Sequence, residues 1–204
     1  ATLTVTTTDD ENDGDTSNIS ALLASSGGTG ISLREAIIAA NNTAGADRIE
    51  FNIAGSGTQV INLSSGLDQI TEQVTIDGTT QNGWTEGSFL PIVIDGNDGA
   101  FDGLNFAATA DGSEARGLVI RDFGFNSIDI DAGADNVTIA GNFLGAFDSS
   151  GAYVGGEEVG GAIIYGRADN STIGGSTAAD RNIIGGGPNG IVLLHCDWRH
   201  AHRL

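Results

Sequence analysis

The sequence has no lysine, no methionine and a single cysteine, Cys196, and it contains only two prolines and few aromatic residues. One thiol excludes an internal disulfide. All eight basic residues are arginines, and together with 27 acidic residues they leave a net charge of −19. Because no basic patch is available to replace the counterions of DNA or RNA, we expect no nucleic-acid partner.

Long apolar runs are also missing. None approaches the roughly 20 residues that a membrane-spanning helix needs, so we expect no membrane-spanning segment, and no signal peptide is recognisable. The chain does contain 32 glycines and 39% hydrophobic residues. This combination is typical of an all-β domain with many short strands and tight corners, and it supplies enough apolar side chains for a core.

Short apolar strands recur along the chain. Residues 118–120 and 137–139 are two of them, and between them Ile128, Asp129, Ile130 and Asp131 alternate strictly. Alternation places the isoleucines on one face of a strand and the aspartates on the other. A strand that returns after one coil can stack on its predecessor about 4.8 Å away. The pattern predicts a parallel β-helix in which residues 118–120 and 137–139 belong to stacked coils.

The other expected strands fall into two series. Residues 49–53, 59–63, 74–76 and 92–94 make the first, in which 74–78 and 92–96 are near copies of each other. Residues 104–106, 128–130, 162–164 and 191–193 make the second. The gaps between the strands vary, so we expect loops to leave the coil at 79–91 and 146–160.

The N-terminal region begins with an expected strand over 2–8, followed by an acidic run that includes Asp9, Glu11 and Asp13. Oxygen ligands at alternate positions, with Gly14 sixth from Asp9, are similar to half of an EF-hand calcium loop. Ser20 stands where such a loop has its glutamate. A solvated acidic loop therefore competes with a surface calcium site, and residues 19–31 are expected to form a flexible loop.

The strongest helix signal follows. Ser32 and Glu35 make a Ser-x-x-Glu capping box, and apolar residues continue from Leu33 at helical spacing until Asn41 and Asn42. An uncovered end of a solenoid would expose core side chains and strand edges to water. We expect this short helix to cover the N-terminal end.

The segment with this helix resembles a known family. The stretch Ile31-Ser-Leu-Arg-Glu-Ala-Ile37, with 38–42 and 47–51 after it, resembles the Cys-Ser-Leu-Arg-Glu-Ala (CSLREA) domain of bacterial secreted and surface proteins. Ile31 stands where that family usually has cysteine, so its small disulfide is missing here. Residues 136–145, 170–175 and 181–185 are similar to right-handed β-helix repeats. The resemblance implies a right-handed parallel β-helix with one short N-terminal capping α-helix, and a secreted or bacterial cell-surface location.

Three regions follow from these patterns. Residues 1–55 are expected to form the N-terminal strand, acidic loop and capping helix, and residues 56–194 the coils. Residues 195–204 lack glycine and hold all three histidines, so they are expected to be an atypical tail of vector or frameshift origin. His195, His200 and His202 with Cys196 are a weak zinc candidate. The absence of a C-terminal cap suggests self-association through that end.

Several acidic residues are candidates for chemistry. Asp77 and Asp95 follow similar strands, and they would either share a calcium ion or make Asx turns with their own backbone. Asp129 and Asp131, with Arg116, Arg121 and Asp122 on the neighbouring expected strand, form the densest charged set. Paired carboxylates of this kind protonate a glycosidic oxygen and activate water in glycoside hydrolases. The alternative is a ladder of surface ion pairs across neighbouring coils.

Aromatic residues on loops are candidates for sugar contacts. Trp84, Phe89, Tyr153 and Tyr165 would stack on sugar rings, or else anchor the loops on which they lie. The first functional hypothesis is therefore an extracellular or cell-surface module that binds a polysaccharide or cell-surface glycan, or acts in adhesion. The second is a lyase or glycoside hydrolase acting on an acidic polysaccharide, with calcium as its only expected cofactor. A stalk that spaces other domains is the third.

Overall fold

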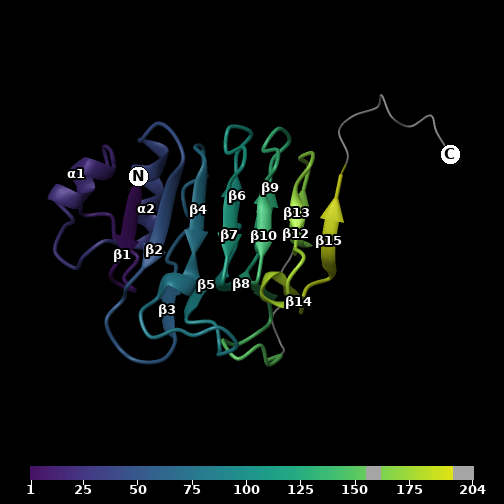
Figure 1. Ribbon diagram of the computed structural model, residues 1–204. Helices are drawn as coiled ribbons and strands as arrows, with labels where there is room; N and C mark the ends of the chain where they lie inside the picture. The colour runs from purple at the N-terminus through teal and green to yellow at the C-terminus, as the bar shows by residue number, and fades with distance from the viewer. Residues whose placement is uncertain (155–161, 195–204) are drawn as a thin grey trace.

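The computed structural model describes residues 1–154 and 162–194, in which short parallel strands are stacked side by side from one end of the molecule to the other (Figure 1). Strand is far more abundant than helix in this part of the chain, and the strands form three parallel sheets. We call them sheets A, B and C. The fold is therefore all-β in character, as the glycine-rich, alternating sequence predicts.

Sheet A has six strands, which lie in the order β1-β2-β4-β7-β10-β13. Their bounds are β1 Thr2–Val5, β2 Asp47–Phe51, β4 Val74–Asp77, β7 Glu114–Arg116, β10 Thr138–Ala140 and β13 Thr172–Ile173. Sheet B has five strands in the order β14-β11-β8-β5-β3. These are β3 Gln59–Asn62, β5 Ile92–Gly99, β8 Leu118–Phe123, β11 Phe143–Gly145 and β14 Ile183–Gly185.

Sheet C has four strands in the order β15-β12-β9-β6. They are β6 Leu104–Phe106, β9 Ile128–Ile130, β12 Ala162–Gly166 and β15 Asn189–Leu193. Leu104, Ile128, Ile164 and Ile191 pair in one register across the four strands. These strands are the second series expected from the sequence, and their parallel stacking is confirmed.

From β4 onward the chain enters the three sheets in a fixed rotation. A strand of sheet A is followed by one of sheet B and then one of sheet C, so β7, β8 and β9 are succeeded by β10, β11 and β12. Each strand pairs with the strands that occupy its place in the rotations before and after it. This arrangement decides which side chains, far apart in sequence, become neighbours.

The predicted stacking of residues 118–120 and 137–139 is wrong. Strand β8 pairs with β5 and β11 in sheet B, whereas β10 pairs with β7 and β13 in sheet A. The near copies 74–78 and 92–96 also separate, since β4 lies in sheet A and β5 in sheet B. The reason is the length of a full rotation, which takes 24 residues from Val119 to its sheet B partner Phe143, whereas residues 118 and 137 are only 19 apart. The corner between sheets A and B is also tight within this rotation. Only Gly117 separates β7 from β8, and its φ of 67° is a left-handed conformation that favours glycine.

Two helices lie at the β1 end of the stack (Figure 1). Helix α2, Leu33–Asn41, contacts β1 and β2, and its capping box between Ser32 and Glu35 is present as predicted. Helix α1, Ile19–Ala24, occupies a region where the sequence predicts a loop. The Asn18 side chain caps α1 by accepting a hydrogen bond from the Ala21 N–H. Helix α1 buries Ile19 and Leu22, so tertiary packing stabilises a helix too short to be stable alone.

One continuous cluster of buried apolar residues runs through the stack from Leu3 to Ile164. Its largest fully buried side chains include Phe51, Phe106 and Phe123. Burying a side chain of this size contributes about 1.5–3 kcal/mol relative to leaving it exposed. The core therefore holds the three sheets together, and residues that alternate with it along each strand point outward.

Candidate functional site

Asp77 and Asp95 lie in different sheets, at the end of β4 and within β5. Each carboxylate folds back on its own backbone. Asp77 Oδ1 accepts a hydrogen bond from the Thr79 N–H at 3.0 Å, and Asp95 Oδ1 accepts one from the Asn97 N–H at 2.9 Å. These are Asx turns, the alternative to a shared calcium ion.

The second oxygen of each carboxylate pairs with an arginine on the neighbouring strand of its own sheet. Arg48 Nη2 lies 2.6 Å from Asp77 Oδ2, and Arg121 Nη2 lies 2.9 Å from Asp95 Oδ2. Arg116 Nε also lies 4.0 Å from Asp77 Oδ1. The outer faces of sheets A and B thus carry ladders of ion pairs, which compensate part of the chain's negative charge.

The proposed catalytic set is divided between two sheets. Asp129 belongs to β9 in sheet C and Asp131 follows that strand, whereas Arg121 and Asp122 belong to β8 in sheet B. Arg121 forms ion pairs with Asp95 and with Asp122. The structure therefore brings Asp129 and Asp131 together and gives Arg121 different partners.

Arg167 replaces Arg121 as the cation beside the two sheet C carboxylates. Its guanidinium pairs with Asp131, and Arg167 Nη2 lies 3.6 Å from Asp129 Oδ1. Burial raises the pKa of the Asp129 carboxyl, Arg167 opposes this shift, and the nearby Asp102 and Asp131 charges add to it. Asp129 is therefore easier to protonate than an exposed aspartate, a property expected of a general acid.

The acidic loop does not gather its carboxylates in one place. Different donors satisfy Asp9, Glu11 and Asp13: respectively the Thr7 hydroxyl at 3.0 Å, the Thr29 hydroxyl at 3.4 Å and the Gly28 N–H at 2.9 Å. Within residues 1–154 and 162–194, no group of three or more His, Cys, Asp or Glu side chains is arranged to hold a metal ion. Calcium binding at Asp9, Glu11 and Asp13, or at Asp77 and Asp95, stays a prediction.

The two tyrosines suggested for sugar contacts lie in separate places. Tyr153 is 62% exposed and packs edge-on against Phe147, with ring centroids 5.9 Å apart. Tyr165 lies in β12, in register with Asp129, and the Arg167 guanidinium carbon lies 5.4 Å from its ring centroid. The zinc candidate of His195, Cys196, His200 and His202 lies outside the described residues.

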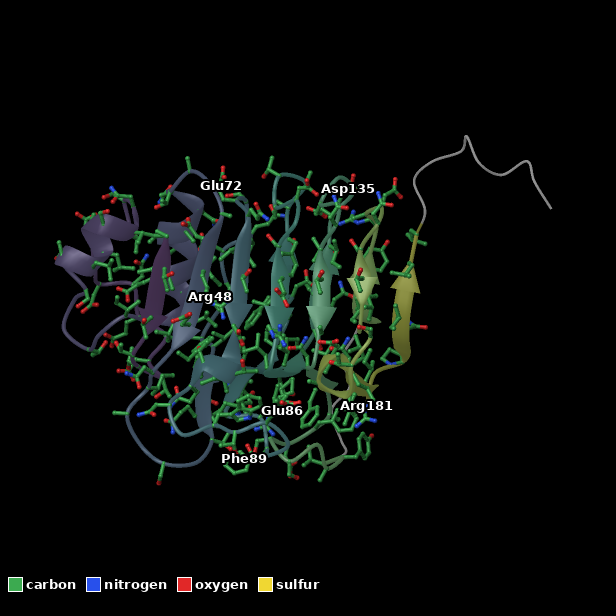
Figure 2. The ribbon with its side chains drawn as sticks, viewed as in Figure 1. Arg48, Glu72, Glu86, Phe89, Asp135 and Arg181 are labelled. Carbon is green, nitrogen blue, oxygen red and sulfur yellow. The ribbon has the colours of Figure 1, made fainter. Side chains whose placement is uncertain are left out.

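A groove with a volume of about 580 Å³ lies beside the loop 82–91. We call it the corner groove, because it follows the corner between sheets A and B. The loop contributes Trp84, Glu86 and Phe89, and the strands and corners contribute Arg116 and Arg181. Other lining residues include Thr79, Leu90, Gly117, Gly141, Phe143 and Ile183. Glu86, Phe89 and Arg181 lie along one edge of the molecule in Figure 2.

Hydrogen bonds hold the groove's aromatic wall in place. Trp84 Nε1 donates to the Phe89 carbonyl at 3.0 Å, and the Leu90 N–H donates to the Ser149 carbonyl at 2.8 Å. Trp84 is half-buried and Phe89 is 45% exposed, so both rings remain accessible in part. Trp84 and Phe89 also line a second hollow of about 400 Å³, with Gly55 and Pro91. The loop is therefore a ridge with a hollow on each side.

Sequence reasoning singled out Trp84 and Phe89 but missed the arginines opposite them. In the sequence Arg181 is only the first residue of the repeat-like stretch 181–185, and nothing in the spacing of residues 84 and 181 indicates that they line one groove. They line one groove because η2, Ala178–Asp180, lies at the same corner as η1, Gly78–Thr80, three rotations further along the stack.

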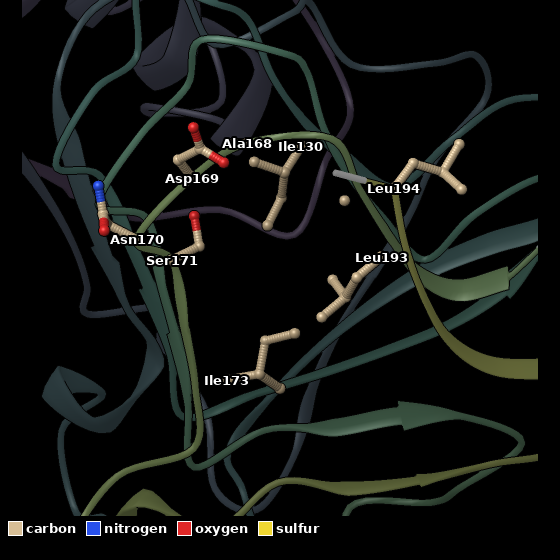
Figure 3. Close-up of a pocket in the computed structure, with 9 residues that line it drawn as sticks. Ile130, Ala168, Asp169, Asn170, Ser171, Ile173, Leu193 and Leu194 are labelled. Carbon is tan, nitrogen blue, oxygen red and sulfur yellow. The ribbon is translucent and has the colours of Figure 1, made fainter. Parts of the chain in front are cut away.

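Another cavity, of about 340 Å³, lies near the β15 end of the stack. Figure 3 shows Ile130, Ile173, Leu193 and Leu194 around it, with Asp169 at one side. Its walls combine the buried Ile130 with the exposed Leu193 and Leu194 and the polar segment 169–171. Leu193 is 64% exposed, and self-association through this end stays a prediction.

None of the helices in the described part of the chain has the length and apolar character needed to cross a lipid bilayer. Comparison of the chain with models of protein families, with curated proteins and with solved structures finds no match. The geometry of the sites must therefore support any functional proposal by itself.

Proposed function

We propose that this chain is a right-handed parallel β-helix module of a secreted or bacterial cell-surface protein, and that it binds a polysaccharide or cell-surface glycan in the corner groove. The rotation of strands through sheets A, B and C supports the β-helix. The resemblance to the CSLREA domain supports the location and a capping role for residues 1–55.

The observation that carries the binding proposal is the corner groove with Trp84 and Phe89 in its wall. Sugar rings present C–H groups on one face, and aromatic rings offer them a flat apolar surface. Arg116, Glu86 and Arg181 supply donors and acceptors for hydroxyl groups around that surface. A volume of about 580 Å³ is within the range of small-ligand sites.

The experiment is a glycan array followed by calorimetric titration of the best ligand. Phe89→Ala and Phe125→Ala form a matched pair, because both phenylalanines are about half exposed but only Phe89 lines the groove. We expect Phe89→Ala to weaken binding about tenfold, as loss of an aromatic contact does, and Phe125→Ala to have no effect. Equal effects of the two variants, or no bound glycan, would reject the proposal.

A second function has a specific observation in its favour. The raised pKa of Asp129 beside Asp131 is the arrangement expected of a general acid and a second carboxylate acting on a glycosidic bond. Release of reducing ends from polysaccharides by the wild-type chain, and its loss in both Asp129→Asn and Asp131→Asn, would support a hydrolase. Turnover that persists in these variants would show that Asp129 and Asp131 are not the catalytic residues.

A further inference from the structure

Arg181 is an exposed arginine, and none of the carboxylates in the described part of the chain pairs with it. Within residues 1–154 and 162–194 its guanidinium makes no ion pair and no hydrogen bond. The other arginines of this part of the chain all form ion pairs: Arg34, Arg48, Arg116, Arg121 and Arg167. As far as the described residues go, the five N–H donors of Arg181 are thus available at the wall of the corner groove.

The surroundings of Arg181 keep it available. Its neighbour Asp180 is engaged by Thr177, whose N–H and hydroxyl donate to Asp180 Oδ2 at 3.0 and 2.8 Å. Glu86, the carboxylate of the corner groove, makes no ion pair with any described residue. Arg181 therefore lines the groove as a cation whose charge neither Asp180 nor Glu86 neutralises through an ion pair.

We propose that the ligand of the corner groove is an anionic saccharide, and that Arg181 selects it by pairing with a carboxylate or sulfate group while a sugar ring contacts Trp84. This inference rests on the proposed saccharide binding and adds the ligand's charge to it. The guanidinium fork matches the geometry of a carboxylate or sulfate, and such charge-assisted hydrogen bonds are stronger than neutral ones. Glu86 opposes the same ligand by repulsion, so the two residues set its position in the groove.

The test is a titration of the full chain with two matched ligand pairs: oligogalacturonate with its methyl ester, and sulfated with unsulfated dextran oligosaccharide. We expect the charged member of at least one pair to bind at least about tenfold more tightly. Arg181→Gln should remove this preference and Arg181→Lys should keep part of it, because lysine retains the charge but not the fork. A preference for the charged ligand in the galacturonate pair only would identify the recognised group as a carboxylate. A preference in the dextran pair only would identify it as a sulfate.

Charge-matched variants provide the control. Glu86→Gln should tighten binding of the charged ligand, whereas Glu72→Gln, the same change at the opposite edge of the molecule in Figure 2, should not. The Arg181 side chain forms no ion pair or hydrogen bond with residues 1–154 or 162–194, so its variants should keep the wild-type unfolding temperature. If the wild-type chain binds saccharides without regard to charge, or if Arg181→Gln changes nothing, the inference about the ligand's charge is wrong but the proposed saccharide binding still stands. If it binds none of the four ligands and no glycan on the array, the saccharide function is wrong as well.

Discussion

The side-chain oxygen of Asn182 accepts a hydrogen bond from the backbone N–H of Asn142 at 2.9 Å. Asn142 does the same for the rotation before it, because its Oδ1 accepts the Leu118 N–H at 3.0 Å and its Nδ2 donates to the Ala115 carbonyl at 2.9 Å. Asn182 Nδ2 donates to the Ile139 carbonyl at 2.7 Å. Two asparagines thus satisfy the backbone groups that the tight corner between sheets A and B leaves without strand partners.

Asn142→Ala should lower the free energy of unfolding by about 3 kcal/mol, because it leaves a buried N–H and a buried carbonyl without partners. Asn142 is fully buried, whereas Asn62 in β3 is exposed and its side chain makes no hydrogen bond with the described residues. Asn62→Ala should therefore stay within about 0.5 kcal/mol of the wild type. Urea unfolding of the two variants measures the difference, and similar values would show that the asparagine corner contributes little.

Glu35 should be essential for the order of the acidic loop. Its fully buried carboxylate accepts hydrogen bonds from the N–H groups of Asp13, Gly14 and Ser32, at 3.0, 2.7 and 2.9 Å. Glu35→Gln places an amide donor among these donors, so it should cost about 2 kcal/mol or more. Limited proteolysis should then cut the variant in the loop faster than the wild type. The exposed Glu11→Gln serves as the control, and equal cleavage of both would contradict this role.

Calcium should have little effect on the stability of the chain. The carboxylates of the acidic loop already accept hydrogen bonds from the protein, and Asp10 pairs with Arg34 at 2.9 Å. We therefore expect the same unfolding temperature in EDTA and in millimolar calcium. A rise in calcium that Asp13→Asn abolishes would instead establish the loop as a calcium site.

The burial of Asp129 predicts that the free energy of unfolding of the chain depends on pH in a specific way. Burial raises the pKa of Asp129 in the folded state above its unfolded value, so the folded chain holds this proton more tightly. The bound proton therefore contributes stability that is fully present below the unfolded pKa. This contribution is lost as the pH rises through the folded pKa. Asp129→Asn should therefore raise the unfolding temperature at pH 7, and this gain should disappear below the unfolded pKa. Asp68→Asn, at an exposed position, should show no such gain, and an equal response of both variants would exclude a burial effect.

Most strand positions could be predicted from the sequence, because short apolar or alternating runs mark them regardless of their neighbours. Strand β7, Glu114–Arg116, has no such run and was not expected. The sheet to which each strand belongs was harder to predict than the position of the strand. A corner made by Gly117 alone leaves no visible break between β7 and β8, so the sequence does not show where one sheet ends and the next begins. Residues 118–120 and 137–139 were expected to stack, but they belong to β8 in sheet B and β10 in sheet A. Only sheet C, whose strands are separated by long connections, was grouped correctly.

The candidate sites show the same limit. Trp84 was identifiable because an aromatic residue on a glycine-rich loop stands out in the sequence. Arg181 was not, since its importance depends on which carboxylates lie near it in space. Arg121 was assigned to Asp129 and Asp131 by proximity in sequence, whereas the rotation of strands gives that position to Arg167.

The most direct test of the corner groove as a glycan site is calorimetric titration of the best array ligand into the wild-type chain and into Trp84→Ala. The account predicts binding by the wild type and about a tenfold weaker association with Trp84→Ala, with the fold of the variant confirmed by its circular dichroism. Equal affinities of the two proteins for that ligand would contradict it.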